Sequence, residues 1–122
     1  MKPLFVYGTL MGTSPQSAVL GRVERAAAKT RGKLWRLPQG YPALELGGDD
    51  WVYGELVQPV SDSLLALVDK YEGVDEGLYQ RLDVDVVVGL RVVSAWTYAM
   101  VTPKMRGGTL IPSGRYTSVT RR

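Results

Sequence analysis

Cysteine and histidine are both absent from this chain of 122 residues. Without cysteine, the chain has no disulfide, no thiol nucleophile and no zinc–thiolate site. Without histidine, a Ser-His-Asp triad, a Cys-His pair and any histidine-bound metal are excluded as well. Any proton transfer must therefore be carried out by Glu, Asp, Lys, Tyr or water.

Long apolar runs are also missing. No segment approaches the roughly 20 consecutive apolar residues that a membrane-spanning helix needs. The short apolar run near the N-terminus is interrupted by Tyr7-Gly8-Thr9, which argues against a signal peptide. We therefore expect one domain, residues 1–122, located in the cytoplasm and built around one hydrophobic core.

Acidic residues are scarce outside the middle of the chain, although the net charge is only +3. Residues 45–85 hold eleven of the twelve acids, whereas residues 21–36 hold six basic residues and one acid. The basic segments either attract anionic molecules, including nucleic acid, or form a solvated face. No RNA-binding aromatic motif or recognition-helix pattern accompanies the charge, so we favour the solvated face.

The hydrophobic pattern is dominated by strands. It predicts two helices, at residues 14–20 and 61–72, and strands at residues 2–7, 27–37, 43–46, 51–58, 80–88, 91–100 and 109–111. The Gly-Gly-Asp-Asp sequence at residues 47–50 is a hairpin signal. Gly54, inside a predicted strand, indicates a bulge or a close approach by another group. This pattern favours a curved or closed sheet over a doubly wound parallel one.

Glu72 is the strongest candidate for a catalytic group. It continues the apolar face of its predicted helix, four residues after Val68 and seven after Leu65. It also lies in the last turn, where the helix dipole disfavours a negative charge. Partial burial and the dipole would both raise its pKa, as suits a general base near neutral pH. The alternative is a surface glutamate at the helix end.

The turn Tyr7-Gly8-Thr9-Leu10 follows the first strand and is the second candidate. Gly8 permits a sharp turn, so successive N–H groups can converge on a carboxylate or a developing oxyanion. The Thr9 hydroxyl offers a further donor. The alternative is an ordinary turn that ends a strand, and the phosphate-binding P-loop pattern is missing.

Three further side chains are candidates for a pocket. Tyr79 and Tyr98 either supply hydroxyl groups to it or pack in the core, and core packing is commoner for aromatic strand residues. Glu55, inside a strand, is either a second acid in a cavity or a solvent-facing residue, and we favour the latter.

Four motifs together resemble the gamma-glutamylcyclotransferase-like family, including its gamma-glutamylamine cyclotransferase branch. The motifs are, in chain order, Phe5-Val6-Tyr7-Gly8-Thr9-Leu10, Tyr53-Gly54-Glu55-Leu56-Val57, Leu67-Val68-Asp69-Lys70-Tyr71-Glu72-Gly73 and Gly77-Leu78-Tyr79-Gln80-Arg81. The resemblance runs from about residue 4 to residue 100. It implies an α+β fold, a small mixed β-barrel with two flanking helices.

The resemblance also implies an activity. Family members release 5-oxoproline from gamma-glutamyl compounds without a metal or cofactor. Carried over to this chain, Glu72 takes the general acid/base role, the turn of Tyr7, Gly8, Thr9 and Leu10 binds substrate, and Tyr79 lines the pocket. We expect a small-molecule gamma-glutamyl substrate rather than nucleic acid or a membrane as the partner, and a monomer or weak dimer.

Two alternative functions stay open. A non-catalytic binding module would use the same cavity to hold a small carboxylate metabolite. A nucleic-acid-associated protein would use the basic segments and would bind in a strongly salt-dependent way.

Overall fold

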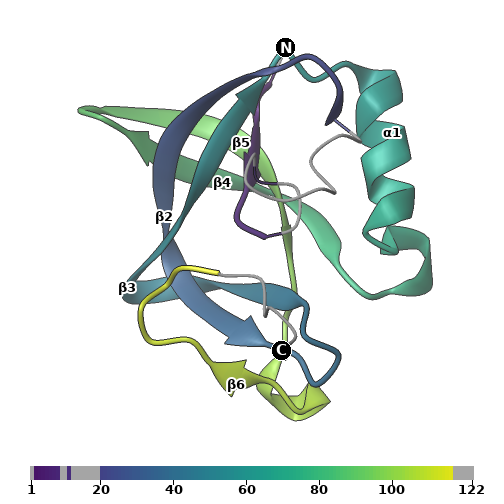
Figure 1. The fold of residues 1–122 in the computed structure, drawn as a ribbon, viewed down its shortest axis with the longest axis vertical. Coiled ribbons are helices and arrows are strands. Elements are labelled where there is room, and N and C mark those ends of the chain that lie inside the picture. The colour runs from purple at the N-terminus through teal and green to yellow at the C-terminus, as the bar shows by residue number, and fades with distance from the viewer. Residues whose placement is uncertain (1, 9–10, 12–19, 117–122) are drawn as a thin grey trace, which may run out of the picture.

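The described part of the chain folds into a small barrel of strands with one helix beside it (Figure 1). The computed structural model describes residues 2–8, 11 and 20–116. Its strands are β1 (Leu4–Val6), β2 (Glu24–Arg36), β3 (Pro42–Gln58), β4 (Gln80–Val88), β5 (Arg91–Ala99) and β6 (Thr109–Leu110). Its helix is α1 (Asp62–Tyr71), and two single 3-10 turns are η2 (Val74–Glu76) and η3 (Lys104–Arg106).

The sheet closes on itself in the order β3-β1-β5-β4-β2, because β2 also pairs with β3. Strand β6 pairs with the last residues of β2. Strand β1 runs parallel to β5, and the other pairings are antiparallel. The predicted small mixed β-barrel is therefore confirmed. The predicted helix at residues 61–72 is present as α1, while the one at residues 14–20 lies outside the described residues apart from Leu20.

Strand β1 is buried on both faces, which explains its unbroken apolar sequence. Leu4 and Val6 pack with the helix residues Leu65 and Val68 in one core cluster. The alternate residue Phe5 points the other way, into a second cluster that fills the barrel. Each fully buried side chain of this size stabilises the fold by about 1.5–3 kcal/mol, so this short strand holds the helix and the barrel together.

Helix α1 begins and ends as the sequence predicts. The Ser61 hydroxyl accepts a hydrogen bond from the Leu64 N–H at 3.1 Å and caps the N-terminus. Gly73 adopts a left-handed conformation with φ of +70° directly after the Glu72 C-cap. No helix in the described ranges is long and apolar enough to cross a membrane.

The predicted hairpin at residues 47–50 is wrong. The segments on both sides of it pair with β2, from Pro42 opposite Arg36 to Gln58 opposite Glu24. The register shifts opposite Arg31 and Gly32, and residues 47–50 bulge out of one continuous strand. Two consecutive glycines with positive φ allow this bulge as readily as they allow a turn.

The connection between β2 and β3 is a turn at residues 37–41, where the sequence Pro38-Gln39-Gly40-Tyr41-Pro42 predicts one. The Leu37 N–H donates to the Tyr41 carbonyl at 2.8 Å, and the Gly40 N–H donates to the Leu37 carbonyl at 2.8 Å. This turn places Tyr41 and Pro42 beside Gly8, where a Cβ would lie 2.5 Å from the Pro42 Cγ. Segments separated by more than thirty residues in the sequence thus meet at the end of β1.

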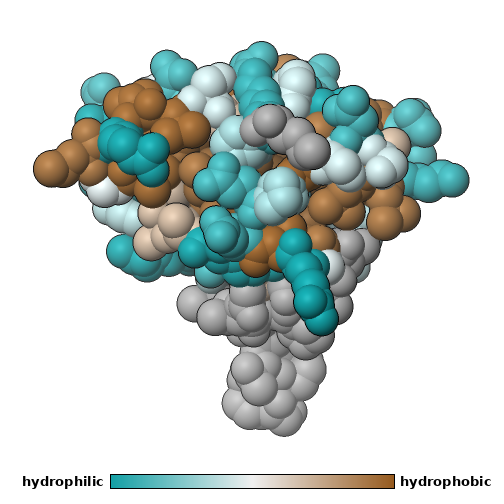
Figure 2. All heavy atoms as spheres, turned by 90° about the horizontal axis from the view of Figure 1, so that it is seen from above, coloured by the Kyte–Doolittle hydropathy of each residue, from teal (hydrophilic) through white to brown (hydrophobic). Residues whose placement is uncertain are grey.

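Apolar side chains also reach the solvent at the tip of the β4–β5 hairpin, where Leu90 is fully exposed and Val92 largely so. Figure 1 shows this hairpin projecting from the barrel, and Figure 2 shows apolar side chains gathered on that side of the molecule. The hairpin tip is distant from α1 in Figure 1 and belongs to the side of the barrel away from the helix.

Gly54 has the close neighbour that the sequence indicates, since a Cβ there would overlap the Val6 carbonyl oxygen. We expect Gly54→Ala to lower the free energy of unfolding by about 2 kcal/mol or more, because β1 must shift away from β3. Chemical denaturation measures this change. Gly47→Ala is the comparison, because only its positive φ opposes a side chain and the expected cost is about 1–2 kcal/mol. Wild-type stability of Gly54→Ala would contradict the packing described here.

Candidate active site

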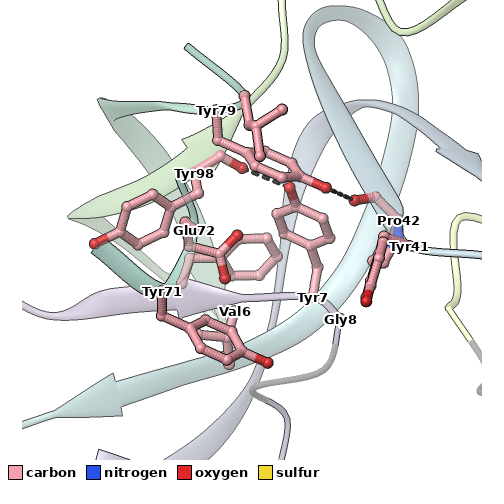
Figure 3. A pocket seen from close by; sticks show the side chains of 11 residues that line it. Val6, Tyr7, Gly8, Tyr41, Pro42, Tyr71, Glu72, Tyr79 and Tyr98 are labelled. Carbon is pink, nitrogen blue, oxygen red and sulfur yellow. Dashed lines mark hydrogen bonds between the residues drawn. The ribbon is translucent and has the colours of Figure 1, made fainter. Parts of the chain in front are cut away.

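A cavity of about 290 Å³ opens between the end of β1, the β2–β3 turn and the C-terminal end of α1 (Figure 3). Most of its lining is aromatic or apolar, and a single carboxylate lies among these side chains. The lining residues are Phe5, Val6, Tyr7, Gly8, Tyr41, Pro42, Tyr71, Glu72, Leu78, Tyr79 and Tyr98. Such a cavity, mostly apolar with a few converging polar groups, is typical of a small-molecule site.

Glu72 lies in the cavity wall and is half-buried, rather than standing at the exposed surface of the helix end. Its backbone N–H donates to the Val68 carbonyl at 2.8 Å, so the last turn of α1 fixes its Cα. Figure 3 shows its carboxylate directed among the rings of Tyr7, Tyr71 and Tyr98. Burial raises the pKa of Glu72 from 4.5 to about 7, because few water molecules remain to solvate its charged form.

The Tyr7 hydroxyl is fully engaged by the protein. It donates to the Tyr98 carbonyl at 2.5 Å and accepts a hydrogen bond from the Leu44 N–H at 3.2 Å. Burial, followed by the negative charges that Tyr79 and Glu72 can carry, raises the Tyr7 pKa well above its ordinary value. Tyr7 therefore holds the end of β1 in place and is not a proton donor to a ligand in this structure.

Tyr79 and Tyr98 also use their hydroxyl protons within the protein. The Tyr79 hydroxyl donates to the Pro42 carbonyl at 2.5 Å, which ties the segment after α1 to the β2–β3 turn. The Tyr98 hydroxyl donates to Asp69 at 2.6 Å, and the same Asp69 oxygen accepts a hydrogen bond from Arg81 at 2.8 Å. Burial is the main cause that raises the pKa of both tyrosines.

Glu72 is consequently the lining residue whose protonation changes near neutral pH. The three buried tyrosines keep their protons, and no lysine or arginine is among the lining residues in the described part of the chain. A half-buried carboxylate with a pKa near 7 can accept a proton and return it at neutral pH. The arrangement is suited to acid/base chemistry by a single group.

The structure brings together four of the predicted site residues, Tyr7, Gly8, Glu72 and Tyr79. Thr9 and Leu10 lie outside the described residues. Glu55 does not line this cavity and instead forms an ion pair with Arg25 at 2.9 Å. Within residues 2–8, 11 and 20–116, no three acidic side chains are grouped so that they could hold a metal ion.

Sequence reasoning did not single out four residues of the cavity: Phe5, Val6, Tyr71 and Leu78. All four lie in the motifs that carry the family resemblance, so their position near Tyr7 and Glu72 was a usable signal. Tyr41 and Pro42 belong to the loop at residues 38–42, one of those expected at the mouth of the pocket, and the β2–β3 turn places both in the cavity lining.

The family model for gamma-glutamyl cyclotransferase, AIG2-like, matches residues 4–118 of this chain. AIG2-like protein D of Arabidopsis thaliana is 30% identical over 91 residues. That match covers 72% of this chain, and the chain spans only 58% of the length of the plant protein.

Solved structures share the fold. An AIG2-like protein from Mus musculus superposes with a TM-score of 0.77 at 25% identity, over 100% of this chain and 99% of the mouse protein. A structure described as a gamma-glutamyl cyclotransferase superposes with a TM-score of 0.68 at 18% identity, over 82% of this chain and 66% of that protein. At this lower identity the similarity shows the fold alone.

The raised pKa of Glu72 has a consequence for stability. Below about pH 4 the carboxyl group is protonated in the folded and unfolded chains alike, whereas above about pH 7 the folded protein must hold a poorly solvated carboxylate. Wild type therefore loses stability as the pH rises through this window. We expect Glu72→Gln to be more stable than wild type at about pH 8, by at most about 3 kcal/mol, and therefore to melt at a higher temperature. Near pH 4 the two proteins should melt at similar temperatures.

Thermal melts at the two pH values measure this difference, with the exposed Glu76→Gln as the control. The control is expected to melt at the same temperature as wild type at both pH values. A Glu72→Gln variant that is less stable than wild type at the higher pH would contradict the burial of an ionisable carboxylate.

Proposed function

Because this chain belongs to the AIG2-like gamma-glutamyl cyclotransferase family, we propose that it is a cyclotransferase that releases 5-oxoproline from a gamma-glutamyl amine or a small gamma-glutamyl peptide. The observation that carries the proposal is Glu72, a half-buried carboxylate with a pKa of about 7 in the wall of an otherwise aromatic cavity. An acid/base group of this kind is the one that the cyclisation requires.

The nucleophile is part of the substrate. The α-amine of the glutamyl unit attacks its own γ-carbonyl carbon, which forms the lactam C–N bond and a tetrahedral oxyanion. Glu72 accepts the proton that the attacking amine loses and then gives it to the departing nitrogen as the original γ-amide bond breaks. The products are 5-oxoproline and a free amine, and Glu72 ends in its initial state.

The cavity contributes by holding the substrate in a folded conformation. The flexible glutamyl chain must bring its amine and its γ-carbonyl into contact, and such orientation is worth up to about 7–11 kcal/mol in intramolecular reactions. The rigid walls supplied by Tyr7 and Tyr79, each hydrogen-bonded to backbone, suit this task. Backbone N–H groups of the turn that begins at Gly8 are the proposed donors to the substrate carboxylate or the oxyanion.

The first test of the proposal is the loss of the base. We expect Glu72→Gln to lower 5-oxoproline release from gamma-glutamyl dipeptides and gamma-glutamyl amines by about 10²–10⁴-fold, because glutamine has the size of glutamate but cannot accept the proton. Mass spectrometry of the product measures the rate.

Glu76→Gln is the matched control, because Glu76 is an exposed acid four residues away and should leave the rate unchanged. An unchanged rate in Glu72→Gln would reject the proposed mechanism. If wild type forms no product with any substrate but is stabilised by one of them, the cavity belongs to a binding module instead.

The pH dependence is a second test. Because the active form of Glu72 is the carboxylate, we expect kcat/KM of wild type to rise with pH through an ionisation at about 7. The residual activity of Glu72→Gln should lack this ionisation and keep only that of the substrate amine. A wild-type profile without a change near neutral pH would show that another group acts as the base.

A further inference from the structure

The cavity has an inner part and an exposed mouth. The inner residues Phe5 and Tyr7 are at most 6% exposed, whereas the mouth is formed by Tyr41, Tyr71 and Leu78, which are 57%, 45% and 44% exposed. We call these three residues the mouth cluster. In Figure 3, Tyr41 and Tyr71 lie on opposite sides of the space in front of Glu72.

The mouth cluster is held in place by the backbone. Tyr41 follows the tight turn at residues 37–41, and the next residue, Pro42, accepts the hydrogen bond of Tyr79. The Leu78 N–H donates to the Gly73 carbonyl at 3.1 Å, and a Cβ on Gly73 would lie 2.6 Å from the Leu78 side chain. The large exposed side chains therefore converge at one opening as a consequence of the fold.

The charges around the mouth disfavour an anionic group. The lining residues of the described chain include Glu72 but no lysine or arginine. Asp75 and Glu76 are exposed in η2, directly after Glu72. Three cations are near in the fold or the sequence: Arg36, which donates to the Gly40 carbonyl at 3.4 Å, Arg106, which donates to the Gly77 carbonyl at 3.4 Å, and the exposed Lys70. None of the three lines the cavity, so a carboxylate at the mouth would lose water without gaining an ion pair there.

The geometry of the proposed reaction indicates which part of the substrate lies at the mouth. The amine and γ-carbonyl of the substrate must meet beside Glu72, and the group on the other side of the scissile amide must leave toward solvent. Resting on the proposed function, we propose that the mouth cluster binds this leaving amine and selects one with an aromatic or apolar body and no carboxylate, such as an arylalkylamine. Two tyrosine rings and a leucine offer the stacking surface and apolar area that such a group buries.

The test compares three substrates that share the glutamyl unit: the gamma-glutamyl amides of phenethylamine and methylamine, and gamma-glutamyl-phenylalanine. We expect kcat/KM for the phenethylamide to exceed that for each of the other two by about tenfold or more, because burial of an aromatic ring is worth at least that factor. Mass spectrometry of 5-oxoproline measures all three rates. Equal rates for the phenethylamide and the methylamide would overturn the proposal.

Substitutions in the mouth cluster test whether its side chains cause the preference for the phenethylamide. Tyr41→Ala and Tyr71→Ala should each lower the ratio of kcat/KM for the phenethylamide to kcat/KM for the methylamide by about fivefold or more, since only the larger leaving group reaches the mouth. Tyr71→Phe keeps the ring and should keep the selectivity. Leu67→Ala is the matched control, an exposed apolar residue of α1 that does not line the cavity. Equal losses for both amides in the tyrosine variants would also overturn the proposal.

Binding separates the failure of this proposal from the failure of the proposed function. Calorimetric titration of Glu72→Gln with each of the three compounds should show the tightest binding for the phenethylamide, without any turnover. If wild type forms no 5-oxoproline but this order of affinity holds, the proposed reaction is rejected and the assignment of the mouth cluster is supported. If product forms but the affinities are equal, or if none of the three binds, the assignment of the mouth cluster is rejected.

Discussion

The hydroxyl group of Tyr7 is the point on which the geometry of the site depends. One hydrogen bond ties it to the carbonyl of Tyr98 in β5, and another ties it to the N–H of Leu44 in β3. The end of β1 is thereby fixed against both of its neighbours at the place where the strand opens into the cavity. Since β1 is also buried on both faces, it cannot move without disturbing the helix and the barrel together.

Burying a carboxylate at this place costs free energy. The same burial raises the pKa of Glu72 into the range where it can exchange a proton at neutral pH. Glu72 sits at the end of a helix, where the dipole opposes a negative charge, and in a cavity that excludes much of the water. Tyr7, Tyr79 and Tyr98 do not relieve it, because their hydroxyl protons are already donated to carbonyl groups and to Asp69. The stability of the rest of the fold offsets this free-energy cost, as is usual for groups whose pKa is shifted so that they exchange protons near neutral pH.

The sequence was informative wherever a local pattern had one structural solution. The apolar face of residues 61–72 predicted a helix, and the capping Ser61 and Gly73 marked its ends. Whether Glu72 is buried stayed open until the structure placed it in the cavity wall. The bulge at residues 47–50 could not be foreseen, because Gly-Gly-Asp-Asp fits a turn equally well until β2 is known to pair on both sides of it. The loop that carries Tyr41 was expected at the mouth of the pocket, but the contact between Gly8 and Pro42 that places it there is tertiary and has no local signal.

The inner part of the cavity and its mouth differ in how tightly the fold constrains them. Its inner wall is built by β1 and by the last turn of α1, which belong to the core and tolerate little change in volume. Its mouth is built by Tyr41, Tyr71 and Leu78, whose side chains are exposed and belong to neither core cluster. Substitutions at the mouth therefore cost little stability, whereas those in the inner wall disturb the packing of β1. Under the proposed function, such a barrel can keep one reaction at its centre while residues at its mouth change the amine that it accepts.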